Sequence, residues 1–340
     1  MKECVLVAGG AGYIGSHTAV ELVEAGYDVV IVDNLSNSVR EAVDGVRKIT
    51  GVEVPFEELD CCDMAAFEAI FKKYKFNSAI HFAASKAVGE SVQMPLEYYQ
   101  NNLGSLMNLI ALMRKYERPN ILFSSSCTVY GEPDAQPVTE QTPRKAALSP
   151  YGNTKAMSED ILRDSMNQYE GMKGIALRYF NPIGAHPSAL IGELPQGVPQ
   201  NLVPYITQTA AGLRDCLSVF GDDYKTADGS CIRDYIDVVD LAKAHVIAVE
   251  RMVSGKSKSD YEIFNIGTGN GVSVLELLTK FQAVNNVKLN YKIAPRREGD
   301  ITAIWADPSL ANNELGWKAT RTIEETLKAA WEWEKKVRNL

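Results

Sequence analysis

Short apolar runs alternate with amphipathic stretches along the first half of the chain. The apolar runs have the length and composition of strands that a parallel sheet buries on both faces: residues 4–8, 28–32, 77–82, 120–124 and 174–179. The stretches between them mix apolar and polar positions as helices do: residues 13–25, 95–114 and 151–168. This alternation predicts an α/β fold, a doubly wound parallel sheet of the Rossmann type, through about residue 180.

The pattern changes after residue 180 and then partly returns. Residues 181–232 contain many glycines and prolines and few regular periods, whereas residues 233–266 again read as strand, helix and strand. We therefore expect a discontinuous first domain and a second, smaller α/β domain for the substrate. The expected division is residues 1–180 plus about 233–270 for the first, and 181–232 plus about 271–340 for the second.

Composition narrows the class of partner and the compartment. The chain of 340 residues has a formal net charge of −8, so it lacks the basic face that nucleic acid or an acidic membrane surface would need. No apolar run approaches the ~18–20 residues of a membrane-spanning helix, and the first residues do not read as a signal peptide. We expect a globular cytoplasmic protein with a small-molecule substrate.

The cysteine spacing indicates neither a zinc site nor a disulfide framework. The six cysteines form no C-x-x-C pair: Cys4, Cys61, Cys62, Cys127, Cys216 and Cys231. Unpaired thiols in a chain of this size are typical of a reducing cytosol. We expect no metal.

A glycine-rich loop follows the first strand. Residues 9–15 read Gly-Gly-Ala-Gly-Tyr-Ile-Gly, so Gly9, Gly12 and Gly15 satisfy G-x-x-G-x-x-G between a strand and a helix. Glycine lets the backbone approach a pyrophosphate, and the helix start offers free N–H groups to the anion. Asp33 ends the next strand eighteen residues after Gly15, where its carboxylate can accept both ribose hydroxyls of an adenosine. This pattern favours NAD over NADP, whose 2′-phosphate the carboxylate would repel; a purely structural turn is the alternative.

A tyrosine and a lysine share one face of the helix expected after Ser149 and Pro150. Tyr151 and Lys155 are four residues apart, and Ser149 is a favoured helix cap. A phenol becomes a useful base when a neighbouring ammonium, the helix start and a cationic nicotinamide lower its pKa. Ser126 ends the strand 120–124 and its serine run, at the sheet edge where α/β proteins bind ligands, and can relay the proton. A surface ion-pair spacing and a plain strand-exit turn are the structural alternatives.

Together these features resemble the extended short-chain dehydrogenase/reductase family, and within it the UDP-glucose 4-epimerases. The resemblance covers nearly the whole chain. The matching segments are residues 12–18, 33–35, 86–92, 124–126, 128–131, 149–152, 178–182, 184–188, 233–236 and 294–300.

The resemblance implies an isomerase that interconverts UDP-galactose and UDP-glucose. NAD stays bound and takes a hydride from C4 of the sugar, while Tyr151 removes the hydroxyl proton directly or through Ser126. The 4-keto sugar then turns over in the site and receives the hydride on its other face. The resemblance also suggests a homodimer.

The glycine loop and the motif matches imply the contacts of each ligand. The expected cofactor contacts are Gly9, Gly12, Tyr13, Ile14, Gly15, Asp33, Asn34, Asn37, Ser38, Asp60, Phe82, Lys86, Asn101, Tyr151, Lys155 and Tyr179. The expected substrate contacts are Ser126, Tyr151, Asn181, Asn201, Phe220, Arg233, Arg297, Asp300 and Ile304. The chemistry agrees, because arginines suit a diphosphate, Phe220 can cover a uracil and Asp300 can hold ribose hydroxyls. Without the resemblance, Arg233 and Arg297 read equally well as surface ion-pair partners.

Substrate range and two rival functions stay open. In relatives, a large aromatic at the position of Ile304 restricts the enzyme to plain hexoses and a small residue admits N-acetylated sugars. Isoleucine is intermediate, and we favour the plain hexose. A nucleotide-sugar 4,6-dehydratase or decarboxylase would carry an acidic residue just after Ser126, where this chain has Cys127, Thr128 and Val129. A regulator that only senses NAD would not need Tyr151 and Lys155.

Overall fold

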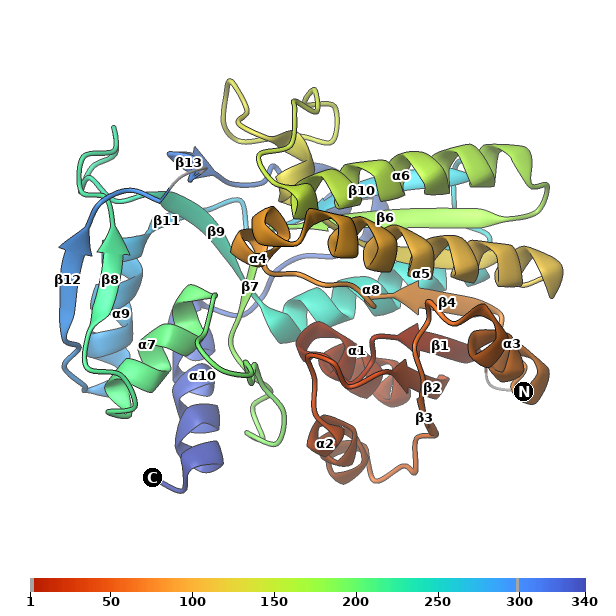
Figure 1. Cartoon of the computed structure of the whole chain (residues 1–340), viewed down its shortest axis with the longest axis horizontal. Coiled ribbons are helices and arrows are strands. Elements are labelled where there is room, and N and C mark those ends of the chain that lie inside the picture. The colour runs from red at the N-terminus through yellow and green to blue at the C-terminus, as the bar shows by residue number, and fades with distance from the viewer. Residues whose placement is uncertain (1–2, 298–299) are drawn as a thin grey trace.

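A seven-stranded parallel sheet forms the larger part of the protein, as Figure 1 shows for the computed structural model, which describes residues 3–297 and 300–340. Neighbouring strands follow the order β10-β6-β5-β4-β1-β2-β3, and every pair is parallel. The strands are β1 (Cys4–Ala8), β2 (Asp28–Asp33), β3 (Phe56–Glu58), β4 (Ser78–His81), β5 (Asn120–Ser126), β6 (Lys173–Tyr179) and β10 (Tyr261–Ile266). The prediction of a Rossmann-type doubly wound sheet is confirmed.

Helices cover both faces of this sheet (Figure 1). Alternate residues of β1 separate the two layers: Val5 and Val7 pack into one core, Leu6 and Ala8 into the other. The first core is closed by α1 (Tyr13–Glu24), α2 (Arg40–Thr50) and α8 (Val238–Val253). The second is closed by α3 (Met64–Lys73), α5 (Pro95–Lys115) and α6 (Pro150–Gln168). The short helices α4 (Val88–Gln93) and η1 (Cys127–Tyr130) follow β4 and β5.

The remaining elements form a smaller part with its own core, at the left of Figure 1. One small sheet contains β7 (Asn181–Ile183), β9 (Ile232–Asp237), β11 (Gly271–Ser273) and β13 (Ala303–Ile304). A second sheet pairs β8 (Leu217–Phe220) with β12 (Tyr291–Ala294) in parallel. The helices here are α7 (Leu202–Ala210), α9 (Val274–Asn285) and α10 (Ile323–Arg338). The π-helical turn η2 (Ala311–Leu315) packs instead into the first core of the large sheet, against α8 and β10.

The segment after residue 232 divides between the two parts. We expected residues 233–239 to return to the large sheet, but β9 pairs with β7, β11 and β13 in the small one. Only β10 joins the large sheet, beside β6. β9 reads Ile-Arg-Asp-Tyr-Ile-Asp, and a strand pattern of this kind does not identify the neighbouring strand, so the partners of β9 could not be read from its sequence. β9 passes directly into α8, whose first turn is capped by the side chain of Asp237.

Candidate functional site

The glycine loop between β1 and α1 has a backbone that only glycine can build. Gly9 has a φ of +81°, and a Cβ there would lie 2.6 Å from the backbone nitrogen of Ala83. A Cβ on Gly15 would lie 2.3 Å from the carbonyl oxygen of Gly9. The loop is anchored to the next strand because the Gly9 amide donates to the Val32 carbonyl at 2.7 Å. The result is a close-packed cradle at the start of α1, which fits the pyrophosphate of a dinucleotide.

Asp33 lies beside this cradle at the end of β2. Its Oδ2 accepts the Ala11 amide at 3.0 Å, and its Oδ1 accepts the Leu35 amide at 2.9 Å and the Ser38 hydroxyl at 2.8 Å. These bonds fix a buried carboxylate next to the loop, as a ribose-binding acid requires. Of the other predicted residues in this region, Asn34, Asn37 and Asp60 are exposed, and the Asn34 amide lies 3.4 Å from Asp60.

The predicted residues after β4 lie farther along the same edge of the large sheet. The ring of Phe82 packs 4.8 Å from that of His245 in α8, measured between centroids. Asn101 of α5 donates to the Ser85 hydroxyl at 3.3 Å. Lys86 instead reaches across to the smaller part, where its Nζ lies 3.4 Å from Oε1 of Glu193.

The tyrosine and the lysine lie on the first turns of α6, as predicted. Ser149 caps this helix by accepting the Gly152 amide at 3.1 Å, and Pro150 is its first residue. Lys155 is buried, its Nζ donates to the Ser124 carbonyl at 2.7 Å, and it lies 5.8 Å from the centroid of the Tyr151 ring. Ser126 at the end of β5 accepts the Thr128 amide at 3.2 Å through its hydroxyl oxygen.

Burial is the main cause of the pKa shifts of Tyr151 and Lys155 in the protein without ligands. The pKa of Tyr151 is raised to about 12, mainly by burial and also by Cys127, while the hydrogen bond with Ser126 opposes the shift. Burial also lowers the pKa of Lys155 to about 8, against the effect of Glu159. The lowering of the tyrosine pKa that we expected from Lys155 is therefore outweighed here by desolvation. A further positive charge beside the phenol would be needed to produce the phenolate.

A titration checks this point. We expect the ligand-free protein to show no Tyr151 phenolate below about pH 10, because its pKa lies near 12. Loading with NAD should move the titration to lower pH, since a cationic ring favours the phenolate. The near-ultraviolet absorbance of phenolate, taken as the difference from Tyr151→Phe, measures both states. A Tyr151-dependent phenolate signal near neutral pH without NAD would contradict the expectation.

Four of the predicted substrate residues form one cluster in the smaller part. Asp300 accepts from Arg233 at 3.3 Å and from Arg297 at 3.0 Å. The Arg297 guanidinium lies 5.0 Å from the centroid of the Phe220 ring at the end of β8. This arrangement presents two cations, a carboxylate and an aromatic face together. Residues 298–299 of the matched segment 294–300 lie outside the described residues.

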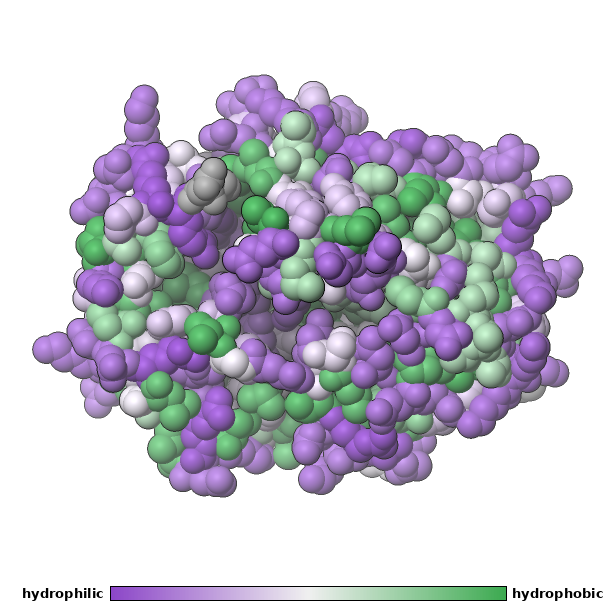
Figure 2. All heavy atoms as spheres, in the orientation of Figure 1, coloured by the Kyte–Doolittle hydropathy of each residue, from purple (hydrophilic) through white to green (hydrophobic). Residues whose placement is uncertain are grey.

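Ile304 and Cys127 connect this cluster with the catalytic residues. Ile304 on β13 is in register with Arg233 on β9 and packs in a core with Cys127, Tyr130 and Phe180. Arg233 is close enough to the Cys127 thiol to oppose the effect of burial, which raises its pKa to about 12. Cys127 in turn influences Tyr151. The cluster and the tyrosine therefore border the same space, and Figure 2 shows a hollow between the two parts of the molecule.

Three other predicted site residues, Tyr179, Asn201 and Asn181, contact residues that were not predicted to belong to the site. The hydroxyl of Tyr179 hydrogen bonds with that of Ser124. Asn201 precedes α7 and donates to Glu193 at 2.6 Å. Asn181 begins β7 in register with Tyr235.

Sequence reasoning missed two residues of this site, Glu193 and Tyr235. Tyr235 is two positions after Arg233 on β9, so strand alternation places it on the same face, and Arg233, Arg297 and Asp300 all influence its pKa. That alternation was the available signal. Glu193 lies in an irregular segment without a pattern.

Two other kinds of site are not found. Within residues 3–297 and 300–340, no group of three or more His, Cys, Asp or Glu side chains is placed to hold a metal ion. No helix in this part of the chain combines the length and the apolar character needed to cross a membrane.

Comparison with known proteins identifies the family. Residues 6–330 match the family described as GDP-mannose 4,6 dehydratase. The UDP-glucose 4-epimerase of Bacillus subtilis is 50% identical over 97% of this chain and 96% of its own length, and that of Mus musculus is 48% identical over 98% and 97%. The chain belongs to the UDP-glucose 4-epimerase family. A crystal structure of the Bifidobacterium longum UDP-glucose 4-epimerase in complex with NAD+ and UDP superposes with a TM-score of 0.95, at 46% identity and 99% coverage of both chains.

This membership confirms the resemblance drawn from the motifs. The family description names a dehydratase, but the similar proteins are epimerases, and this chain has Cys127 and Thr128 after Ser126 instead of a carboxylate.

Proposed function

We propose that this protein is an NAD-dependent isomerase that interconverts UDP-galactose and UDP-glucose at C4 of the sugar. The observation that carries the proposal is the arrangement of Tyr151 and Lys155 on one face of α6 beside Ser126, in a sheet whose first loop is a glycine cradle. A binding protein would need the cradle and not the tyrosine. The relatives compared above are UDP-glucose 4-epimerases, and the one from Bifidobacterium longum was crystallised with NAD+ and UDP.

In this mechanism the side chains move one proton and hold two ligands. The glycine cradle and Asp33 would hold NAD, which would supply reversible hydride transfer at C4 of the sugar. Tyr151 takes the proton of the 4-hydroxyl and gives it back, with Ser126 as a relay at the end of β5. Lys155, held by the Ser124 carbonyl, supplies a positive charge next to the phenol. The arginines hold the nucleotide diphosphate firmly, so the sugar can turn over without leaving.

The two parts of the molecule divide this work. We assign NAD to the large-sheet part, residues 1–180 plus about 233–270, and the nucleotide sugar to residues 181–232 plus about 271–340. Because β9 (Ile232–Asp237) belongs to the small sheet, this boundary moves to the end of β9, and residues 233–237 with Arg233 go to the substrate side. The contacts of NAD and of the nucleotide sugar are those expected from the motifs, extended on the substrate side by Tyr235.

Proton NMR of UDP-galactose incubated with the purified protein and no added cofactor tests the function. We expect the signals of UDP-glucose to grow until the two epimers reach equilibrium. If the sugar stays unchanged even after NAD is supplied, the epimerase assignment is wrong.

The substrate range follows from the packing of Ile304. Its side chain is buried in one core with Tyr130 and Phe180, at the position where relatives distinguish plain from N-acetylated sugars. We propose that the plain hexose is preferred. Ile304→Ala should raise the rate ratio of UDP-N-acetylgalactosamine to UDP-galactose about tenfold, at a cost of about 2–4 kcal/mol in stability. Ile304→Val is the matched control, and an unchanged ratio in the alanine variant would exclude this role.

The outer faces of α5 and α6 offer a surface for a second copy of the chain. A groove of about 580 Å³ between them is lined by Met107, Ile110, Ala111, Arg114, Lys115, Ile161, Ser165 and Tyr169. Figure 2 shows apolar surface over these helices, and Met107 is 49% exposed. We propose a homodimer in which the same face of each copy packs against the other. Sedimentation should show a dimer, and Met107→Glu should shift it toward monomer.

A further inference from the structure

Glu193 is a carboxylate at the border of the two parts to which the proposed function gives no role. Its segment lies against α10: the Trp333 indole donates to the Glu193 carbonyl at 3.0 Å, and a Cβ on Gly192 would lie 2.5 Å from the Trp333 ring. The Glu193 side chain is only 9% exposed. A rigid backbone therefore holds a charged group in a nearly buried position.

One oxygen of this carboxylate accepts from both sides of the cleft. Oε1 lies 3.4 Å from Nζ of Lys86, which follows β4 on the cofactor side. The same oxygen accepts from Nδ2 of Asn201, at the start of α7 on the substrate side, at 2.6 Å. Lys86 and Asn201 are thus joined through Glu193.

Tyr13, a third residue expected to contact a ligand, is also influenced by the charge of Glu193. Tyr13, in the glycine loop, donates its hydroxyl to the Gly184 carbonyl at 2.7 Å. Burial raises the pKa of this phenol, and among the charges that add to the shift Glu193 has the largest effect. The carboxylate therefore acts electrostatically on the start of the cofactor cradle as well as on Lys86.

We propose that Glu193 is a positioning residue that couples the cofactor site to the substrate site. This inference rests on the proposed function, because it takes Lys86 as a cofactor contact and Asn201 as a substrate contact. If NAD moves Lys86, the hydrogen bonding of Glu193 changes, and the orientation of Asn201 changes with it. If UDP moves Asn201, the orientation of Lys86 changes in the same way. Coupling of this kind is reciprocal, so each ligand alters the affinity of the other by the same factor.

The contacts of Glu193 with Lys86 and with Asn201 differ in length and in exposure. Lys86 is 54% exposed and its Nζ lies 3.4 Å from the carboxylate, so solvent or a ligand can replace the contact. The contact with Asn201 is shorter, and Glu193 itself is nearly buried. Removing the charge of Lys86 leaves the carboxylate with the Asn201 amide as its remaining side-chain partner among the described residues.

A double-mutant cycle on UDP affinity tests the proposal in the NAD-loaded protein. We expect Lys86→Met to weaken UDP binding about fivefold, although Lys86 belongs to the cofactor side. In the Glu193→Gln background the same replacement should change UDP affinity less than about twofold. Titration calorimetry measures the four dissociation constants. In turnover, Glu193→Gln should raise KM more than it lowers kcat, which a purely catalytic residue would not do.

Two further measurements complete the test. Glu324→Gln is the matched control, because Glu324 pairs with Lys280 at 2.8 Å on an exposed surface, and it should leave UDP affinity unchanged. Lys86→Met with Asn201→Ala gives a second cycle that leaves Glu193 intact and should be non-additive. If Lys86→Met weakens UDP binding equally in both backgrounds, or the second cycle is additive, Glu193 does not couple the sites. If the wild type binds neither NAD nor UDP, the proposed function itself fails.

Discussion

Replacing Tyr151 by phenylalanine should lower the rate of epimerisation by about 10³-fold or more while NAD binding changes less than about threefold. The substitution removes one oxygen, the atom that takes the proton of the sugar hydroxyl, and general acid–base catalysis contributes roughly 10²–10⁴-fold. The ring would remain beside Lys155, whose Nζ keeps its bond to the Ser124 carbonyl. The NAD cradle lies on another loop and does not depend on the phenol.

Turnover of UDP-galactose by NMR and NAD content by absorbance measure the two effects separately. Tyr261→Phe is a matched control, because Tyr261 is a second tyrosine whose hydroxyl is buried, and it finds no hydrogen-bond partner within the described residues. We expect that variant to turn over normally. Full activity in Tyr151→Phe would eliminate the proposed mechanism, whereas loss of NAD together with activity would assign Tyr151 to binding.

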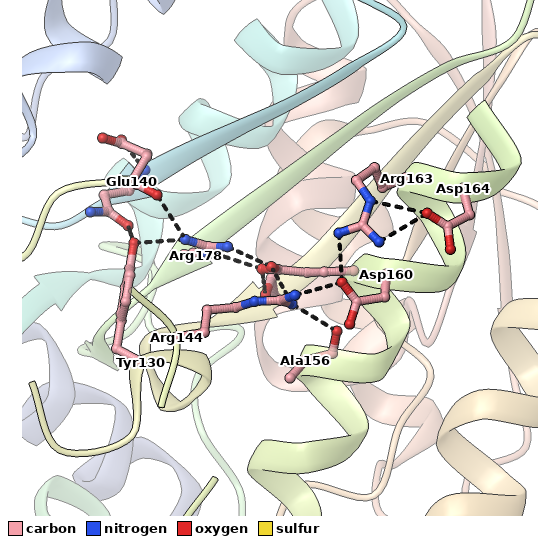
Figure 3. Close-up of polar contacts among 11 residues, drawn as sticks. Tyr130, Glu140, Arg144, Ala156, Asp160, Arg163, Asp164 and Arg178 are labelled. Atoms are coloured by element: carbon pink, nitrogen blue, oxygen red, sulfur yellow. Dashed lines mark hydrogen bonds and ion pairs between the residues drawn. The ribbon is translucent and has the colours of Figure 1, made fainter. Parts of the chain in front are cut away.

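The second large effect is a loss of stability when the buried ion pair between Arg178 and Glu159 is broken. This pair joins β6 to α6, the helix that carries Tyr151 and Lys155. Arg178 of β6 donates to both oxygens of Glu159, at 2.8 and 2.6 Å, and the two side chains are 4% and 2% exposed (Figure 3). Arg178→Met would leave the buried carboxylate of Glu159 with the Ser125 hydroxyl and with Arg144, whose Nη1 lies 3.5 Å from Oε2 and whose side chain is 29% exposed. We expect the free energy of unfolding to fall by about 3–5 kcal/mol.

Denaturant unfolding with NAD at fixed concentration measures this loss. Replacing both partners, as in Glu159→Met with Arg178→Met, should recover most of it, because no uncompensated charge remains. Arg163→Met is the matched surface control, since the Arg163 side chain is 43% exposed and should contribute less than about 1 kcal/mol. A single Arg178→Met variant as stable as the wild type would show that water or Arg144 compensates Glu159.

The local parts of the site could be predicted from the sequence because neighbours in the chain build them. The glycine loop and the Ser149 cap depend on backbone geometry within a few residues, and both lie where the pattern predicts. The spacing of Tyr151 and Lys155 similarly determines their shared helix face. These features need no knowledge of the tertiary fold.

The parts that could not be predicted depend on pairing between distant segments. The sequence of β9 predicts a strand but not its neighbours, which are β7, β11 and β13. The direction of the Tyr151 pKa shift depends on burial, which the spacing to Lys155 does not encode. Glu193 has its contacts with Lys86 and Asn201 only after the two parts have come together.

The direct passage from β9 into α8 limits how the molecule can open. β9 carries Arg233 in the small sheet, and α8 packs against α1, the helix that begins at the glycine cradle. Asp237 locks the junction: it caps α8 and also accepts from Arg321 and Thr326 near α10. The two parts are therefore joined here by a continuous strand and helix and not by a flexible linker. A continuous connection of this kind opposes changes in the distance between Arg233 and the glycine cradle.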